Sequence, residues 1–235
     1  MDTFLDAFAA AFALIFAGDA ALLQILSLSL QVSLSAVGIA VLVGMPLGGL
    51  IAMRAFPGRQ VLIVTFNALM GLPPVVVGLA VYLLLSRSGP FGVFGLLYTP
   101  TAMIIAQVIL VAPIIISLTR QTLDALWREY SETLSSLAAS PAQSLVAILW
   151  DARFSLVTAV LAGLGRAIAE VGAVMIVGGN IDNITRVMTT AIALEASKGD
   201  LALALGLGLI LLLVSVLLNL FGHGMTRFVA NETVQ

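Results

Sequence analysis

Cysteine is absent from this sequence of 235 residues, lysine and histidine occur once each, and charge of either sign is scarce. Charged residues make up 9% of the chain, whereas hydrophobic residues make up 61% and the mean hydropathy is +1.16. About a quarter of the residues in soluble domains are charged, so this composition excludes an ordinary soluble domain. Without cysteine, the sequence gives no indication of the redox compartment. We therefore expect a chain embedded in a lipid bilayer, with no nucleic-acid partner.

Long apolar runs stand where a soluble protein would have charge. Four charge-free stretches are each long enough for the roughly 20 residues that a membrane-spanning helix needs. They are residues 20–53, 60–86, 88–119 and 201–222. A fifth stretch, 154–179, is equally long but contains Arg166 and Glu170, and we accept it on length. Because the alternating pattern of membrane β-strands is absent, the sequence predicts an all-α integral membrane protein with five transmembrane helices.

The N-terminal residues are apolar but too few for a convincing span. Residues 4–17 cover about one-half to two-thirds of a bilayer crossing. They lie beside Asp2 and Asp6 instead of basic residues, which argues against a signal peptide. We expect residues 1–20 to form an interfacial elbow, and the alternative is a sixth span. The transmembrane domain would then cover residues 21–228, followed by a tail at 229–235.

Lysine and arginine are distributed unequally between the two sets of loops that five spans create. One side of the membrane receives six of them: Arg54, Arg59, Arg120, Arg128, Arg153 and Arg227. The other side receives three: Arg87, Arg186 and Lys198. Because cytoplasmic loops retain the excess of positive charge, this bias predicts an external N-terminus, an internal C-terminus and a cytoplasmic segment at 120–153.

The segment 120–153 has the pattern of a helical hairpin. Opposite charges recur every four residues along one helical face, which extends the third span into the cytoplasm; they are Arg120, Asp124, Arg128 and Glu132. A break is expected at residues 138–139. Ser140, Pro141 and Gln143 then predict a capping box with proline at the first helical position, so a second helix starts there and returns to the membrane at Arg153. The charged face either contributes to recognition or is only a solvated surface.

This hairpin resembles the cytoplasmic loop of the transmembrane subunits of type I ATP-binding cassette importers. That loop has the pattern E-A-A, three residues, G, nine residues, I, one residue, L-P. Here Glu132 and Ile148 stand at the matching positions, while Ala138 replaces the glycine and Trp150-Asp151 replace the final pair. Glycine adopts positive φ at little cost and alanine does not, so we expect this chain to make the break in a different way.

Two further stretches resemble the molybdate, tungstate and sulfate permeases of the same importer class. One comprises GLPPVVVG at 71–78, SGPFG at 88–92 and YTP at 98–100. The other comprises GRAIAEVGA at 165–173 and GGNI at 178–181, in a form that looks closest to tungstate permeases. The similarity covers about residues 22–228 and implies the type I permease fold, in a multi-pass protein of a bacterial or archaeal cytoplasmic membrane.

The resemblance implies a division of labour in which this chain is not an enzyme. A phosphate-binding loop needs Gly-Lys-Ser/Thr, but the sole lysine, Lys198, lies between Ser197 and Gly199. ATP and magnesium would therefore bind to a separate dimer of ATPase subunits, and this chain would carry no cofactor or metal. By the resemblance, the ATPase would receive the hairpin through Glu132, Ala138, Ser140, Pro141 and Ile148. A homodimer of permeases would form the pathway, and an external binding protein would deliver the anion for rigid-body alternating access.

Candidate anion contacts follow the fifth apolar stretch. Backbone amides in a glycine-containing nest can hold an oxyanion without a mobile countercharge, and Gly178, Gly179 and Asn180 could form one. Side-chain donors lie just beyond it at Thr185, Arg186, Thr189 and Thr190. The alternative is a loop that only turns the chain.

Two features of the predicted spans are unusual in a lipid environment: a pair of charged residues and a pair of prolines. Arg166 and Glu170 are four residues apart on one helical face, where an unpaired charge in lipid costs at least a few kcal/mol, so we expect them to pair. The pair is either structural or part of a gate that re-pairs during transport. Pro73 and Pro74 break the second span, which therefore faces the protein interior and could shape the pathway.

Two other classes of function remain as alternatives. A secondary transporter or channel would need no ATPase, but five spans without an internal repeat and with few ionisable residues argue against proton coupling. An intramembrane enzyme would need convergent catalytic groups, which the spans do not offer. The sequence leaves tungstate, molybdate and sulfate open as substrates.

Overall fold

The computed structural model describes residues 20–232, so the predicted elbow at 1–20 lies almost wholly outside the described residues. The described part consists of α-helices and one short 3-10 helix, joined by loops. Its helices are α2 (Ala20–Met53), α3 (Arg59–Leu69), α4 (Pro74–Leu85), α5 (Pro100–Ser136), α6 (Pro141–Asp151), α7 (Arg153–Ile168), α8 (Gly172–Gly178), α9 (Met188–Lys198) and α10 (Leu201–Glu232), and the 3-10 turn is η1 (Gly92–Phe94). This confirms the all-α class.

Three of these helices are long and apolar enough to cross a membrane by themselves. They are α2, α5 and the Leu201–Gly222 part of α10. Two bent pairs, α3 with α4 at 102° and α6 with α7 at 77°, raise the number to five if each pair is one span. The described helices therefore provide three to five candidate spans, and the predicted five is reached only when both bent pairs are counted.

Several predicted boundaries are wrong. The stretch 154–179 is not one helix, because α7 ends at Ile168 and α8 begins only at Gly172. The stretch 88–119 is helical only from Pro100, since the residues before it form a tight loop with η1. At the other end, α5 continues to Ser136, as the charge spacing predicts. Helix α10 extends to Glu232, beyond its candidate span Leu201–Gly222, so residues 229–232 of the predicted tail are helical and the boundary at 228 stays a prediction.

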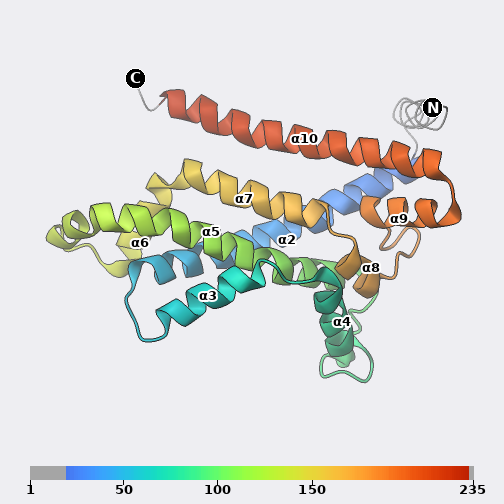
Figure 1. The fold of residues 1–235 in the computed structure, drawn as a ribbon, viewed down its shortest axis with the longest axis horizontal. Coiled ribbons are helices and arrows are strands. Elements are labelled where there is room, and N and C mark those ends of the chain that lie inside the picture. Colours follow the sequence, from blue (N-terminus) through green and yellow to red (C-terminus); the bar gives the residue numbers. More distant parts are fainter. Residues whose placement is uncertain (1–19, 233–235) are drawn as a thin grey trace.

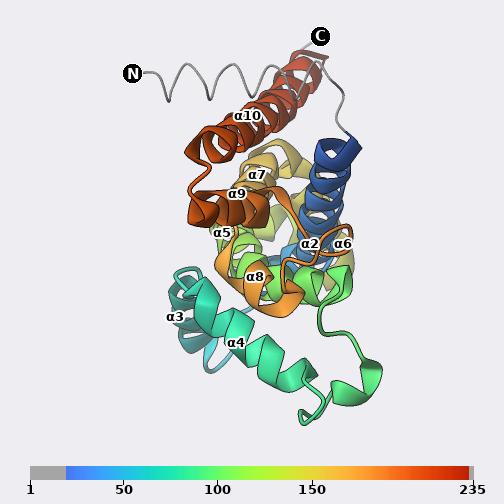
Figure 2. The same ribbon diagram turned by 90° about the vertical axis from the view of Figure 1, so that its right-hand side faces the viewer.

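The helices form layers along the long axis of the molecule (Figures 1 and 2). Helices α2 and α5 run side by side in the centre with α7 packed against both, α10 covers one side, and α3 and α4 lie on the opposite side. Close approach of α2 and α5 depends on glycine: a Cβ on Gly48 would lie 2.7 Å from the carbonyl oxygen of Ile116. Gly48 thus lets the backbones of α2 and α5 approach closely.

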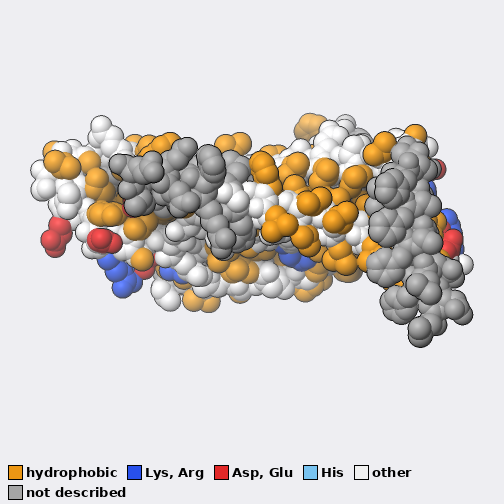
Figure 3. Space-filling view, turned by 90° about the horizontal axis from the view of Figure 1, so that it is seen from above, with side chains coloured by type: hydrophobic (Ala, Val, Ile, Leu, Met, Phe, Trp, Pro, Cys, Tyr) orange, Lys and Arg blue, Asp and Glu red, His pale blue; other side chains and the backbone are white. Residues whose placement is uncertain are grey.

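The surface shows the same division between an apolar middle and polar ends. In the view of Figure 3, hydrophobic side chains cover much of the middle of the described surface, and acidic side chains lie near the two ends. The α5–α6 connection lies at one end of the long axis, and α8 and α9 lie toward the other (Figure 1). This arrangement fits a bilayer around the middle of the molecule.

Candidate functional site

The turn at the end of α5 places Ala138 in the left-handed conformation, with φ at 51°. The N–H of Ala138 donates to the carbonyl of Ser135 (3.0 Å), and the N–H of Ala139 donates to that of Leu134 (3.0 Å). These two bonds form a Schellman motif, whose left-handed position usually holds glycine. The expectation that alanine forces a different break is wrong, because two hydrogen bonds hold Ala138 in the geometry that glycine would adopt.

Helix α6 starts with the predicted capping box. The Ser140 hydroxyl accepts from the N–H of Gln143 (3.4 Å), and the Gln143 side chain accepts from the N–H of Ser140 (2.9 Å). Pro141 occupies the first helical position, where its missing N–H has no consequence. The start of α6 is therefore specified locally by three neighbouring residues.

Ile148 anchors α6 to the rest of the molecule. Its side chain is 1% exposed and belongs to a core cluster with Ala52 of α2, Leu123 of α5 and Leu156 of α7. A partner protein cannot reach Ile148 in this conformation. Its contribution to any docking would be to fix the position of α6.

The hairpin exposes three large apolar side chains among many polar ones, and we call these three, Leu137, Val146 and Trp150, the apolar tip. These side chains are 71%, 66% and 70% exposed. The Arg153 guanidinium lies 4.8 Å from the centre of the Trp150 ring and donates to the Trp150 carbonyl (2.7 Å). Glu132 is also exposed. The hairpin thus exposes a few large apolar groups and a carboxylate, which a binding surface can use.

Of the four charged residues spaced four apart on α5, one neighbouring pair alone forms an ion pair within the described residues. Asp124 Oδ2 pairs with Arg128 (2.9 Å), but Asp124 Oδ1 pairs with Arg59 at the start of α3 (2.7 Å). No ion pair involves Arg120 or Glu132 within the described residues. Asp124 lies beyond the apolar part of α5. Burial alone would raise the pKa of its carboxyl, but hydrogen bonds from Arg59 and Arg128 outweigh burial and hold the pKa below its usual value.

The predicted pairing of Arg166 with Glu170 is confirmed, at 2.9 Å between Nη1 and Oε2. Glu170 is 2% exposed and lies after the end of α7 instead of within a continuous helix. Its second oxygen, Oε1, accepts from the N–H of Ala173 in α8 (3.0 Å). One carboxylate therefore neutralises an arginine and caps the next helix, which explains why the backbone can break here.

The α7–α8 break comprises residues 169–171. Buried polar side chains from other helices lie beside it. Thr189 donates to the Glu170 carbonyl (2.8 Å), and the Gln107 amide donates to the Ala167 carbonyl (3.1 Å). Gln107 is 3% exposed, and its Oε1 has no hydrogen-bond partner among the described residues. Gln107, Glu170, Thr189 and Ser33 line part of a cavity of about 20 Å³, which is large enough for one water. The sequence patterns do not single out Gln107, although it is a lone amide within an apolar run.

Pro73 and Pro74 lie at the sharpest bend, as predicted. Helix α3 ends at Leu69, and α4 begins with Pro74 and runs at 102° to α3. Helix α4 then packs closely on α8: a Cβ on Gly78 would lie 2.8 Å from the Cα of Ala173. One face of α4 thus contacts the protein, while side chains such as Leu83, which is 65% exposed, point away from it.

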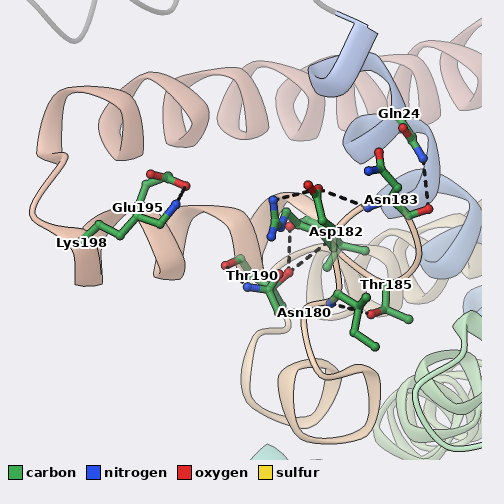
Figure 4. Close-up of polar contacts among 11 residues, drawn as sticks. Gln24, Asn180, Asp182, Asn183, Thr185, Thr190, Glu195 and Lys198 are labelled. Atoms are coloured by element: carbon green, nitrogen blue, oxygen red, sulfur yellow. Dashed lines mark hydrogen bonds and ion pairs between the residues drawn. The ribbon is translucent and has the colours of Figure 1, made fainter.

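The loop after α8 turns through two left-handed residues, Gly179 and Asn180, with φ of 72° and 50°. The amide donors on either side of Asn180 are engaged: Gly179 N–H donates to the Met175 carbonyl (2.9 Å) and Ile181 N–H to the Thr185 hydroxyl (2.9 Å). Thr185 donates in turn to the Gly178 carbonyl. Figure 4 shows Asn180 and Thr185 side by side in this loop. The geometry favours a turn of the chain over a preformed anion nest.

The two cations near this loop are paired with acids. Arg186 Nη1 lies 2.8 Å from Asp182, and Lys198 lies 2.8 Å from Glu195 (Figure 4). Thr190 closes the loop with a hydroxyl that donates to the Val187 carbonyl, while its own carbonyl accepts from the Asn180 side chain (3.5 Å). Asp182 engages only Nη1 of Arg186, and the buried Nε has no hydrogen-bond partner among the described residues, so part of the guanidinium stays available to an anion.

No cluster in the described residues resembles a metal site. Three or more histidine, cysteine, aspartate or glutamate side chains do not come together anywhere between residues 20 and 232. The exposed apolar tip could receive a partner protein. The ion pair and hydrogen bonds at the α7–α8 break could exchange partners if α7 and α8 moved.

A family model described as the inner membrane component of binding-protein-dependent transport systems matches residues 44–233. The tungstate uptake system permease protein TupB of Peptoclostridium acidaminophilum is 41% identical over 219 residues, which cover 93% of this chain and 96% of that protein. A probable anion ABC transporter permease protein of Haloferax volcanii is 40% identical over 185 residues, or 77% of this chain and 80% of that protein.

Similarity to sulfate permeases is lower. The sulfate transport system permease protein CysW of Escherichia coli K12 is 26% identical over 183 residues, or 75% of this chain and 63% of that protein. The tungstate and anion permeases thus share considerably more identity with this chain than CysW does.

Proposed function

The chain belongs to the family of inner membrane components of binding-protein-dependent transport systems, and on this premise we propose that it is the permease subunit of an ATP-driven importer for tungstate or a related oxyanion. One observation carries the choice of substrate: a tungstate permease is 41% identical over 93% of the chain. Molybdate and sulfate are the alternatives, and the lower identity of the sulfate permeases weighs against sulfate.

The α5–α6 hairpin is proposed as the contact with a dimer of ATPase subunits, which would bind ATP and magnesium. The apolar tip supports this proposal because about 70% of each of its side chains is available to a partner. Ala138, Ser140 and Pro141 shape the hairpin, Ile148 holds α6 in place, and the exposed Glu132 would contact the ATPase directly.

Docking is testable with Trp150→Ala. A large, exposed aromatic residue at the centre of an interface typically contributes at least about 2 kcal/mol, so we expect co-purification with the ATPase to weaken about 30-fold or more. Leu212→Ala is the matched control, since Leu212 is 63% exposed but lies along α10, away from the hairpin. Equal retention of the ATPase by both variants would argue against the proposed contact.

The α7–α8 break is proposed as the moving part of the pathway. At this break the buried Glu170 pairs with the partly exposed Arg166, and this ion pair would re-pair during transport. The Pro73–Pro74 bend and the loop with Gly178, Gly179, Asn180, Thr185 and Arg186 lie on the elements next to it. Two copies of the chain would enclose the pathway and alternate between inward-open and outward-open states as rigid bodies.

We place the hairpin in the cytoplasm and the α8–α9 end outside, with the N-terminus outside and the C-terminus inside the cytoplasmic membrane. The unequal arginine count supports this orientation. An external oxyanion-binding protein would then dock at the α8–α9 end and release the anion into the pathway.

The decisive experiment is ATPase activity of the chain reconstituted with its ATPase and binding protein, titrated with tungstate, molybdate and sulfate. Stimulation at a much lower concentration of tungstate is the expected result. Stimulation by molybdate or sulfate instead would reassign the substrate, and indifference to all three would remove the oxyanion from the proposal. Transport without any ATPase would favour a secondary transporter or channel.

A further inference from the structure

Arg59 joins three helices at the hairpin end of the molecule. Its Nε donates to the carbonyl of Ile51 (2.7 Å) and its Nη2 to that of Ala52 (3.3 Å), both in the last turn of α2. The same Nη2 pairs with Asp124 of α5 at 2.7 Å. Arg59 itself is the first residue of α3. The side chains of Arg59 and Asp124 are only 28% and 21% exposed, so they are more sheltered than an ordinary surface pair.

The elements that Arg59 joins form one packed block with α6. Gly49 of α2 brings α6 so close that a Cβ there would collide with Leu145 of α6. Ile148 of α6 is buried in the same block against Ala52 and Leu123. A displacement of α6 must therefore move the ends of α2 and α5 with it, because packed cores resist deformation.

Helix α3 connects this block to the α7–α8 break. Most of its side chains are exposed, and Ile63, packed with Ile51 and Ile116, is its buried residue. Its two ends are held by Arg59 and by the 102° bend into α4. Helix α4 then touches α8 at Gly78 and Ala173, and Ala173 is the residue whose N–H the Glu170 carboxylate accepts.

We propose that the Arg59–Asp124 pair is a positioning device that couples the docking hairpin to the buried α7–α8 break. It holds the start of α3 to the block of α2, α5 and α6, so that a shift of α6 reaches α8 through α3 and α4. This inference rests on the proposed function, in which an ATPase moves the hairpin. It adds Arg59 and Asp124, which are neither among the proposed docking residues nor among the pathway residues, to the coupling mechanism.

The test compares Asp124→Asn and Arg59→Gln with two controls in proteoliposomes that contain the ATPase and the binding protein. Asp124→Glu keeps the charge, and Arg128→Gln removes the 80% exposed partner of the same carboxylate. We expect Asp124→Asn and Arg59→Gln to assemble with the ATPase and to hydrolyse ATP. Tungstate imported per ATP should fall about fivefold or more, while both controls stay near wild type.

A conformational measurement separates coupling from stability. The chain has no cysteine, so a spin label on Ser135→Cys or on Ser88→Cys gives one distance between the two copies of the proposed homodimer. Trapping with ATP should change both distances in the wild-type background. In the Asp124→Asn background, the Ser135 distance should still change, whereas the Ser88 distance, next to α4, should not.

Three results would overturn the inference: normal transport per ATP in Asp124→Asn, a normal change at Ser88 in that background, or failure of Asp124→Asn to assemble while Arg128→Gln assembles. The last result would make the pair a stability element only. A wild-type complex that ignores every oxyanion would instead refute the proposed function, so the two failures are distinguishable.

Discussion

At the scale of single residues, Ala138 turns the chain between α5 and α6 with φ at 51°. A residue with a Cβ is disfavoured there by roughly 1–2 kcal/mol, and glycine is not. Glycine in turn loses more backbone entropy on folding, by about 0.4–1 kcal/mol. The two effects oppose each other, and the left-handed strain is the larger one.

We therefore expect Ala138→Gly to raise the free energy of unfolding by up to about 1 kcal/mol. Ala139→Gly is the matched control, because Ala139 has no positive φ and the change should lower stability by about 0.4–1 kcal/mol. Denaturant or thermal unfolding of the solubilised protein measures both. If both glycines destabilise equally, Ala138 is not strained.

Glu170 combines two tasks that a glutamine can only partly fulfil. Glu170→Gln keeps an oxygen for the Ala173 N–H but leaves Arg166 without its countercharge. We expect the variant to insert in the membrane, to lose about 1–3 kcal/mol of stability, and to import tungstate more slowly. Asp182→Asn, which breaks an exposed pair, should change stability by less than about 1 kcal/mol. Wild-type uptake by Glu170→Gln would contradict a gating role.

At the scale of elements, the contact between α2 and α5 is set by backbone proximity. A Cβ on Gly48 would lie 2.7 Å from the Ile116 carbonyl oxygen, which belongs to the helix backbone and cannot rotate away. A Cβ on Gly38 would meet nothing within 4 Å. The two glycines occupy the same helix but different surroundings.

Gly48→Ala should therefore lower the free energy of unfolding by about 1–3 kcal/mol, because the helices must separate. Gly38→Ala should leave it unchanged or raise it by up to about 1 kcal/mol through better helix propensity. Thermal unfolding of the two variants under identical conditions gives the comparison. Equal effects would mean that the α2–α5 contact is looser than the structure shows.

The sequence predicts well those elements whose ends are set by residues adjacent in the chain. The capping box at Ser140, the break at Pro73–Pro74 and the extension of α5 to Ser136 follow from local rules. The α7–α8 break does not, since the run 154–179 contains no proline. It depends on Thr189 and Gln107, which reach Glu170 and Ala167 from other helices. The pairing of Asp124 with Arg59 is likewise a tertiary contact that spacing along α5 cannot reveal.

At the scale of the whole molecule, the polar hairpin and the α8–α9 loops lie at opposite ends of a body with an apolar middle (Figures 1 and 3). Six basic residues fall on the predicted inner side and three on the outer side. The chain must cross the bilayer between the hairpin and the loop before α10 for this division to hold, and since α6 belongs to the hairpin, α7 must form that crossing.

Single cysteines placed in a chain that has none test this arrangement directly. Ser135→Cys lies at the end of α5, and Ser197→Cys lies near the end of α9. Because cytoplasmic loops retain arginine and lysine, we expect a membrane-impermeant maleimide to label Ser135→Cys only from the cytoplasmic side and Ser197→Cys only from outside. The reverse pattern would invert the topology and remove the hairpin from any cytoplasmic ATPase. Labelling of both from one side would show that the chain does not cross the bilayer between the hairpin and the end of α9, which would leave the Arg166–Glu170 pair in a re-entrant segment instead of a transmembrane pathway.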